Sequence, residues 1–145
     1  MIVEAEVTIN ATKDKVWSVM ANIRNASEII SGIEKIEVLE EPASGITGLR
    51  WRETRMYFGK PAAVEKQITD AVEKEFYKTK AEMEGYIFLS TLRISESNGV
   101  VTLTSSHEYI PQGIVAKLKS IPMIFFKGMI KKALLQDLKD IKSHV

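Results

Sequence analysis

Residues 100–141, VVTLTSSHEYIPQGIVAKLKSIPMIFFKGMIKKALLQDLKDI, contain the change of pattern that decides the fold. Up to Tyr109 every second residue fits one face of a β-strand. Pro111 and Gly113 end this strand, and the remaining stretch predicts a helix that Pro122 kinks, because proline lacks a backbone donor. Its apolar residues recur at helical spacing: Ile114, Leu118, Ile121, Phe125, Met129, Ala133, Leu138 and Ile141. Such a helix needs a sheet on which to bury its apolar face.

The N-terminal segment predicts one strand and then short helices. Residues 3–10 alternate strictly between apolar and polar side chains, which is typical of a strand with one wet face. Thr12 follows, and its side-chain oxygen suits the first position of a helix. Gly32 ends the helical stretch. We therefore expect two short helices within residues 12–31.

The middle of the chain predicts a meander of strands. The expected further strands are residues 33–40, 48–58, 62–70, 75–83, 86–95 and 100–109. Asn98 and Gly99 suit a two-residue hairpin turn, because both tolerate a positive φ. Short connections without intervening helices favour antiparallel pairing, and many sequential strands make a twisted, curved sheet. The prediction is an α+β fold with a curved seven-stranded antiparallel sheet wrapped around the long C-terminal helix, in one domain spanning residues 1–145.

Composition excludes several classes of protein. The net charge of +1 argues against a nucleic-acid partner, whose phosphates select strongly basic surfaces. Cysteine is absent, which removes thiolate metal sites and disulfides. The start MIVEAEVTIN does not have the basic residues followed by an unbroken apolar stretch that a signal peptide needs. The longest apolar run, residues 121–126, is far shorter than the ~20 residues that span a membrane. We expect a cytoplasmic protein without a metal or cofactor.

Several sequence segments, in this order, carry a resemblance to a known superfamily. They are VTINATKDKVWSVM (7–20), GITGLRWRET (45–54), the turn at Gly59, HEYIPQG (107–113) and LLQDLKDIK (134–142). Over residues 2–142 the chain resembles the START-like, or SRPBCC helix-grip, superfamily, which includes birch-pollen-allergen-like proteins and the polyketide cyclase/dehydrase and lipid-transport type. The resemblance implies a helix-grip fold with a cavity for an apolar ligand between sheet and helix. It does not define the ligand, because this superfamily is functionally diverse.

The inward faces of the predicted strands and helix supply the candidate ligand-binding residues. These are Trp51, Glu53, Arg55, Tyr77, Tyr86, Phe88, Ser90, His107, Tyr109, Phe125 and Met129. An apolar wall with a few polar groups is typical of ligand pockets, although the aromatic side chains suit core packing equally. Glu53 and Arg55 lie two apart on one strand face, which fits either a structural ion pair or a ligand anchor. His107 fits either a structural histidine or a proton-transfer group.

Three functions remain open at this point. The first is a binding or carrier protein for a hydrophobic small molecule, such as a lipid, isoprenoid or polyketide-like compound. The second is a polyketide cyclase/dehydrase-like enzyme that uses His107 or Glu53 for proton transfer. No other catalytic constellation is present in the sequence, so we assign no catalytic residue.

The third function is a lipid-exchange or interaction module that touches a membrane surface transiently through the basic C-terminal helix. The segment IPMIFFKGMIKK (121–132) is apolar and then basic, which suits an anionic surface. The alternative is that Phe125, Met129 and Ala133 face the sheet while the lysines face solvent.

Overall fold

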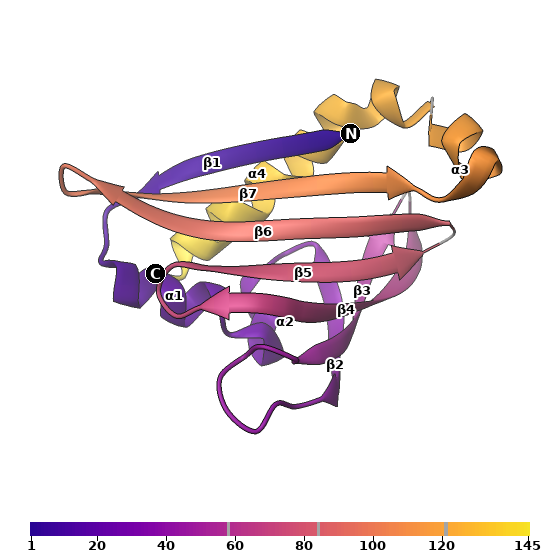
Figure 1. Ribbon diagram of the computed structural model, residues 1–145. Helices are drawn as coiled ribbons and strands as arrows, with labels where there is room; N and C mark the ends of the chain where they lie inside the picture. Colours follow the sequence, from indigo (N-terminus) through magenta and orange to yellow (C-terminus); the bar gives the residue numbers. More distant parts are fainter. Residues whose placement is uncertain (58, 84, 121) are drawn as a thin grey trace.

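The computed structural model describes residues 1–57, 59–83, 85–120 and 122–145, and it has the predicted α+β architecture (Figure 1). The strands are β1 (Ile2–Ile9), β2 (Ile33–Glu40), β3 (Arg50–Tyr57), β4 (Lys60–Val72), β5 (Phe76–Met83), β6 (Tyr86–Ser97) and β7 (Val100–Pro111). The helices are α1 (Lys13–Met20), α2 (Ala26–Ile29), α3 (Gly113–Ser120) and α4 (Lys127–Ser143), with 3₁₀ turns η1 (Ile23–Asn25) and η2 (Pro122–Phe126).

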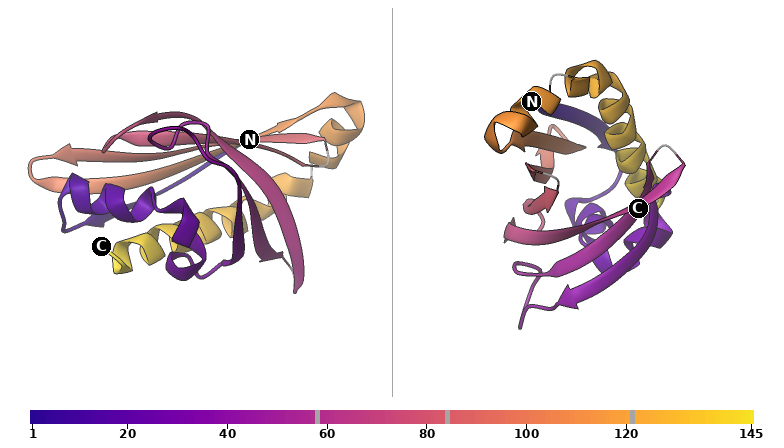
Figure 2. Two further views of the ribbon diagram at one scale, coloured as in Figure 1. Left: turned by 90° about the horizontal axis from the view of Figure 1, so that it is seen from below. Right: turned by 90° about the vertical axis from the view of Figure 1, so that its right-hand side faces the viewer.

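The described strands form one antiparallel sheet in the order β1-β7-β6-β5-β4-β3-β2. Strands β2 to β7 pair in sequence order, so the predicted meander is confirmed. Register shifts interrupt the β2–β3 and β4–β5 pairs, and such bulges increase local twist. Figure 2 shows the result: the sheet curves around α4, and α1, α2 and α4 all lie on its concave side.

The N-terminal elements form as their sequence predicts. Val3, Ala5 and Ile9 of β1 are buried, which is the alternation expected of a half-buried strand. The Thr12 side chain accepts a hydrogen bond from the Lys15 backbone N–H at 3.3 Å and caps α1. The main hydrophobic cluster packs β1, α1, β6, β7 and the C-terminal half of α4 together, and its members include Val16, Met20, Leu103, Leu138 and Ile141.

The predicted long C-terminal helix is confirmed as α4, but the turn η2 interrupts the stretch that was predicted to be helical from residue 114. The described part of this segment forms α3, the turn η2 and the helix α4. The kink was predicted within the turn before Pro122, and that turn includes residue 121, which lies outside the described residues. A 3₁₀ turn has a different period from an α-helix, so the apolar stripe predicted across η2 does not stay in phase. Phe125, predicted to face the sheet, is instead 85% exposed.

Contacts with the β5–β6 turn hold α3 at one end of the sheet. The Gln112 backbone N–H donates to the Gly85 carbonyl at 2.7 Å, and Tyr86 Oη donates to the Ala116 carbonyl at 3.0 Å. Gly85 has φ +81°, and a Cβ there would lie 3.4 Å from the Cβ of Ala116. The turn therefore requires glycine for its backbone conformation and allows α3 to approach closely. Within the described residues, no helix is both long and apolar enough to span a bilayer.

Candidate functional site

A cavity of about 490 Å³ lies between the N-terminal half of α4 and the inner face of the sheet. Its wall comprises Arg55, Val64, Lys66, Thr79, Ala81, Met83, Phe88, Ser90, His107, Tyr109, Phe126, Met129, Ile130, Ala133, Leu134 and Asp137. A smaller space of about 90 Å³ adjoins it, deeper under α1 and α2. The two spaces share a polar boundary made of Arg55, Lys66, Thr79, Ser90, His107 and Asp137.

An ion-pair network forms the charged part of this boundary. Arg55 Nε donates to Glu53 Oε2 at 2.7 Å, and the other two guanidinium nitrogens donate to the Asp137 carboxylate at 3.3 and 2.9 Å. Lys66 Nζ donates to Glu53 Oε2 at 2.9 Å, and Trp51 Nε1 donates to Glu53 Oε1 at 3.3 Å. Arg55 therefore ties strand β3 to helix α4 across the interior, and the pairing of Glu53 with Arg55 is confirmed.

The two carboxylates of the network have opposite pKa shifts. Burial acts to raise the pKa of Glu53, but the charges and hydrogen bonds of Lys66 and Arg55 outweigh it and lower that pKa to about 2. Burial also raises the pKa of Asp137, and there it outweighs the opposing effect of Arg55. Glu53 is only 4% exposed. It is therefore an ionised structural centre whose oxygens already have partners.

His107 and its aromatic neighbours cover the β6–β7 side of the boundary. Burial lowers the pKa of His107, and Lys66 and Arg55 lower it further, to about 4, with only Glu53 opposing them. The imidazole is therefore neutral near pH 7. The Tyr109 ring lies 6.4 Å from the His107 ring and meets Phe88 edge-to-face at 5.1 Å. Thr79 and Ser90 are joined by a hydrogen bond between their hydroxyls, on the adjacent strands β5 and β6.

The structure brings most of the candidate residues together. Arg55, Phe88, Ser90, His107, Tyr109 and Met129 line the larger cavity. Trp51, Glu53 and Tyr77 line only the smaller space. Two candidates line neither: Tyr86 points its hydroxyl to α3, and Phe125 lies on the exposed side of η2.

Sequence reasoning missed the other two charged groups of the site, Lys66 and Asp137. Each is a charged residue on an otherwise apolar face: Lys66 lies between Val64 and Ile68 in the period of a strand. Asp137 lies between Leu134 and Leu138 on the buried face of α4. A charge in such a position needs a buried partner, and this signal would have found both residues. Within the described part of the chain, no group of three or more acidic or histidine side chains is placed to hold a metal ion.

Comparisons with solved structures give the same fold at low sequence identity. The Zhui aromatase/cyclase from Streptomyces sp. R1128 matches with a TM-score of 0.76 at 19% identity, over 99% of this chain and 92% of that one. The major latex-like protein 151 from Panax ginseng matches with a TM-score of 0.74 at 13% identity, over 99% and 96%. A norcoclaurine synthase of Thalictrum matches with a TM-score of 0.70 at 15% identity, over 100% and 96%.

The sequence itself matches no curated protein. It does match a protein family described as "Polyketide cyclase / dehydrase and lipid transport", and the match spans residues 1–141. These residues include every strand of the sheet, the cavity wall and the whole ion-pair network. The chain is a member of the polyketide cyclase/dehydrase and lipid transport family, with the helix-grip fold of its birch-pollen-allergen-like relatives.

Proposed function

We propose that this protein binds and carries a hydrophobic small molecule whose polar end accepts hydrogen bonds. The observation that carries the proposal is the arrangement of the larger cavity. Apolar side chains such as Phe88, Met129 and Ile130 form much of its wall, and Lys66, Arg55 and His107 stand together where it meets the smaller space. A volume of about 490 Å³ falls in the ordinary range of small-molecule sites.

The apolar wall accounts for affinity without specific chemistry. Each Å² of ligand surface removed from water contributes roughly 25 cal/mol, so a ligand with a hydrocarbon body gains most of its binding free energy there. The cavity lies in a family that transports lipids or processes polyketides, so the ligand classes that we propose are a lipid, an isoprenoid or a polyketide-like compound.

The polar boundary accounts for orientation. A lysine ammonium has three donors, and the hydrogen bond given to Lys66 within the described residues is the one to Glu53. Lys66 also lines both spaces, which places its ammonium group within reach of a ligand in the cavity. A carboxyl, carbonyl or hydroxyl oxygen is the complementary group, and neutral His107 can donate or accept beside it.

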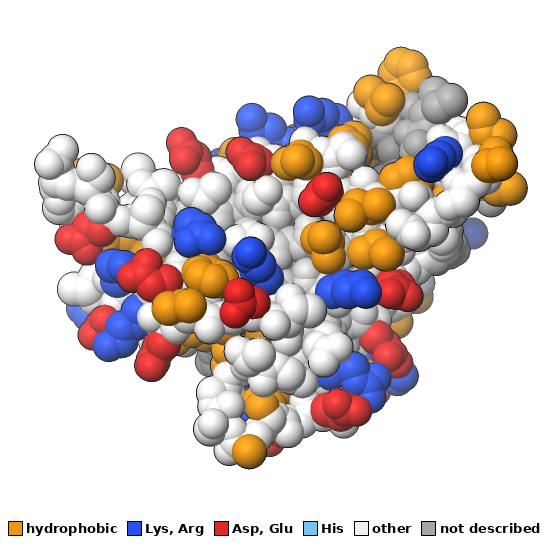
Figure 3. All heavy atoms as spheres, viewed as in Figure 1, with side chains coloured by type: hydrophobic (Ala, Val, Ile, Leu, Met, Phe, Trp, Pro, Cys, Tyr) orange, Lys and Arg blue, Asp and Glu red, His pale blue; other side chains and the backbone are white. Residues whose placement is uncertain are grey.

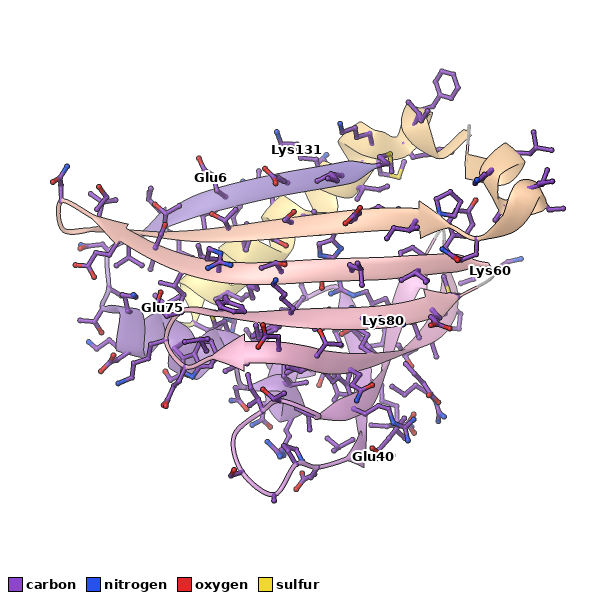
Figure 4. The ribbon with its side chains drawn as sticks, in the orientation of Figure 1. Glu6, Glu40, Lys60, Glu75, Lys80 and Lys131 are labelled. Carbon is purple, nitrogen blue, oxygen red and sulfur yellow. The ribbon has the colours of Figure 1, made fainter. Side chains whose placement is uncertain are left out.

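Native mass spectrometry of freshly purified protein, followed by titration with a fluorescent polyene fatty acid, tests this proposal. We expect either a co-purified mass that is lost on denaturation or saturable binding that a long-chain fatty acid displaces. Lys66→Met should weaken acid binding about tenfold or more, because it removes charge-assisted donors. Lys80→Met is the matched control, since Lys80 lies on the outer face of β5 (Figure 4). A bare mass together with no displaceable binding would reject the carrier function.

One observation favours a second candidate, an enzyme of the cyclase type. His107 is neutral, lines both spaces and is therefore placed to exchange a proton with a bound polyketone. Glu53 is less suited, because it is buried outside the larger cavity and its oxygens are occupied. If the His107→Gln variant still binds a poly-β-ketone but no longer cyclises it, the enzyme function is favoured. If the wild-type protein does not cyclise the poly-β-ketone, the carrier function is favoured.

A further inference from the structure

Apolar side chains gather on the surface at the α3 end of the molecule. Phe125 is 85% exposed and Ile114 is 78% exposed, values that are unusual for such large hydrophobic residues. We define the mouth patch as Ile114, Val115, Leu118, Ile124, Phe125 and Met129, all more than half exposed. Figure 3 shows hydrophobic side chains gathered at this end of the molecule, over α3 and the start of α4. Contiguous exposed patches of this kind mark interaction surfaces.

The mouth patch is continuous with the larger cavity. Met129 belongs to both, because its side chain lines the cavity while 54% of its surface is exposed. Phe126 lines the cavity between Phe125 of the patch and the first turn of α4. The cavity therefore reaches the surface at the patch, and anything that covers the patch also faces the cavity opening.

The chain segment that carries the mouth patch is basic in sequence. Residues 109–136 contain five lysines and no aspartate or glutamate: Lys117, Lys119, Lys127, Lys131 and Lys132. Among them Lys117, Lys127, Lys131 and Lys132 are exposed, and Lys131 extends from α4 near the edge of β1 in Figure 4. These lysines favour a partner surface that supplies negative charge together with apolar volume.

We propose that the mouth patch docks on a lipid bilayer surface that contains anionic lipids. Such a surface offers negative headgroups to the lysines and an apolar layer to the exposed side chains, which is the chemistry of interfacial helices. A second copy of this chain would bring two lysine-rich patches together, and the like charges would oppose that contact. The docked orientation turns the cavity opening toward the bilayer.

Vesicle flotation tests the docking directly. The probe is vesicles of phosphatidylcholine with phosphatidylglycerol, compared with phosphatidylcholine alone, at low and high salt. We expect binding only with the anionic lipid, and its loss at high salt. Replacing both Ile124 and Phe125 by serine should lower the bound fraction about tenfold, because it removes apolar side chains that would enter the bilayer surface. Neither residue lines the cavity, so the ligand site is left intact. The control replaces Val72 and Val100 by serine, because both are about half exposed and lie on hairpins at the opposite end of the sheet.

Charge is tested separately by Lys127→Glu with Lys131→Glu, against the control Lys142→Glu at the other end of α4. The patch-adjacent pair should weaken binding, and the control should not. No binding to anionic vesicles at low salt would overturn the proposal, as would binding that all these variants leave unchanged. A dimer in size-exclusion chromatography that the Ile124→Ser/Phe125→Ser variant dissociates would also overturn it, because a second copy would then cover the patch.

These experiments test membrane docking and ligand binding separately. Titration with the fluorescent fatty acid in the absence of vesicles measures the cavity alone. Serine variants of Ile124 and Phe125 should retain this binding, because both side chains lie outside the cavity wall. Vesicle binding without fatty-acid binding would contradict only the carrier function, and the reverse result would contradict only the docking.

Discussion

The two halves of α4 share an apolar face of helical period but have different surroundings. The C-terminal half buries Leu134, Leu138 and Ile141 against β1, α1 and the neighbouring strands. The N-terminal half carries Met129, Ile130 and Ala133, which face the cavity of about 490 Å³. In both halves apolar residues recur with the helical period, but only the C-terminal half is covered by a second helix.

The difference comes from the position of the short helices. The helix α1 lies under the packed end and fills the space between β6 and α4, whereas α3 turns away at the other end (Figures 1 and 2). A curved sheet that grips a single helix therefore packs tightly only where a third element is added. The ion-pair network of Arg55 lies at the boundary between the packed half and the open half.

The largest effect is expected from breaking that boundary. Arg55→Ala removes the partner of Asp137 and one partner of Glu53, leaving buried carboxylates with too little positive charge. We expect a loss of about 3–5 kcal/mol in the free energy of unfolding. Urea denaturation followed by circular dichroism measures it. Arg52→Ala is the control, because its ion pairs with Glu37 and Glu65 are solvent-exposed; an equal loss there would contradict a special role for the network.

Next in size is the contrast between the halves of α4 themselves. Leu138→Ala should lower the free energy of unfolding by about 3 kcal/mol, because Leu138 is fully packed and leaves a void. Met129→Ala should cost below about 1 kcal/mol, since its side chain is half-exposed and already borders empty space. The same denaturation experiment compares them. Equal losses would mean that the cavity is filled in solution.

Acid should destabilise the open half through His107. Its pKa is about 4 in the folded protein against an ordinary value of 6.5, so the unfolded chain binds the proton more readily. The contribution of neutral His107 to the free energy of unfolding is fully present above the pKa of the unfolded chain and is lost as the pH falls from about 6.5 to about 4. The loss amounts to about 2 kcal/mol between about pH 7 and about pH 5. Glu53 acts in the same direction at lower pH, between 4.5 and about 2.

Stability measured against pH in the His107→Gln variant isolates the histidine. The variant should lose the pH dependence between about pH 6.5 and about pH 4 and keep the loss that Glu53 contributes at lower pH. The His144→Gln variant supplies the same substitution at an exposed position outside the cavity wall. A profile in which His107→Gln behaves like His144→Gln would show that His107 is solvated rather than buried.

The smallest effect is expected at the mouth patch. Phe125→Ser should change the free energy of unfolding by no more than about 0.5 kcal/mol, because the ring has little contact to lose. It should nevertheless reduce vesicle binding, which separates a surface built for a partner from one built for the core. A large loss of stability in urea would instead place Phe125 inside the packed structure.

Local patterns predicted the sheet almost completely. The strand predicted at 33–40 is β2 as observed, and the Asn98–Gly99 turn has the expected positive φ values of 53° and 79°. The alternation of side chains follows from the geometry of a single strand, so it can be predicted without knowing which strands lie beside it. The helical segment was harder, because the turn η2 has a different period from an α-helix and shifts the phase of the apolar residues that follow it.

The candidate site was predicted in part for the same reason. Inward-facing residues of single strands, such as Phe88 and His107, follow from alternation and do line the cavity. The partners of Glu53 and Arg55 come from β4 and α4, and their distances depend on the curvature of the sheet. Tyr86 shares the face of Phe88 in sequence, yet the position of α3 alone decides that its hydroxyl meets Ala116.

The pairing of the first strand with the last has a consequence for synthesis on the ribosome. Ile2 pairs with Glu108 and Ile9 pairs with Val101, so β1 completes its ladder only after almost the whole sheet has been translated. The meander from β2 to β6 joins neighbours in sequence and can form earlier, because short loops close at low entropic cost. Until β1 docks, the newly made β7 presents an unpaired edge, and the β1 of another nascent chain is its natural competitor. Exchange of this single strand between chains is therefore the misassembly to which the topology is most exposed.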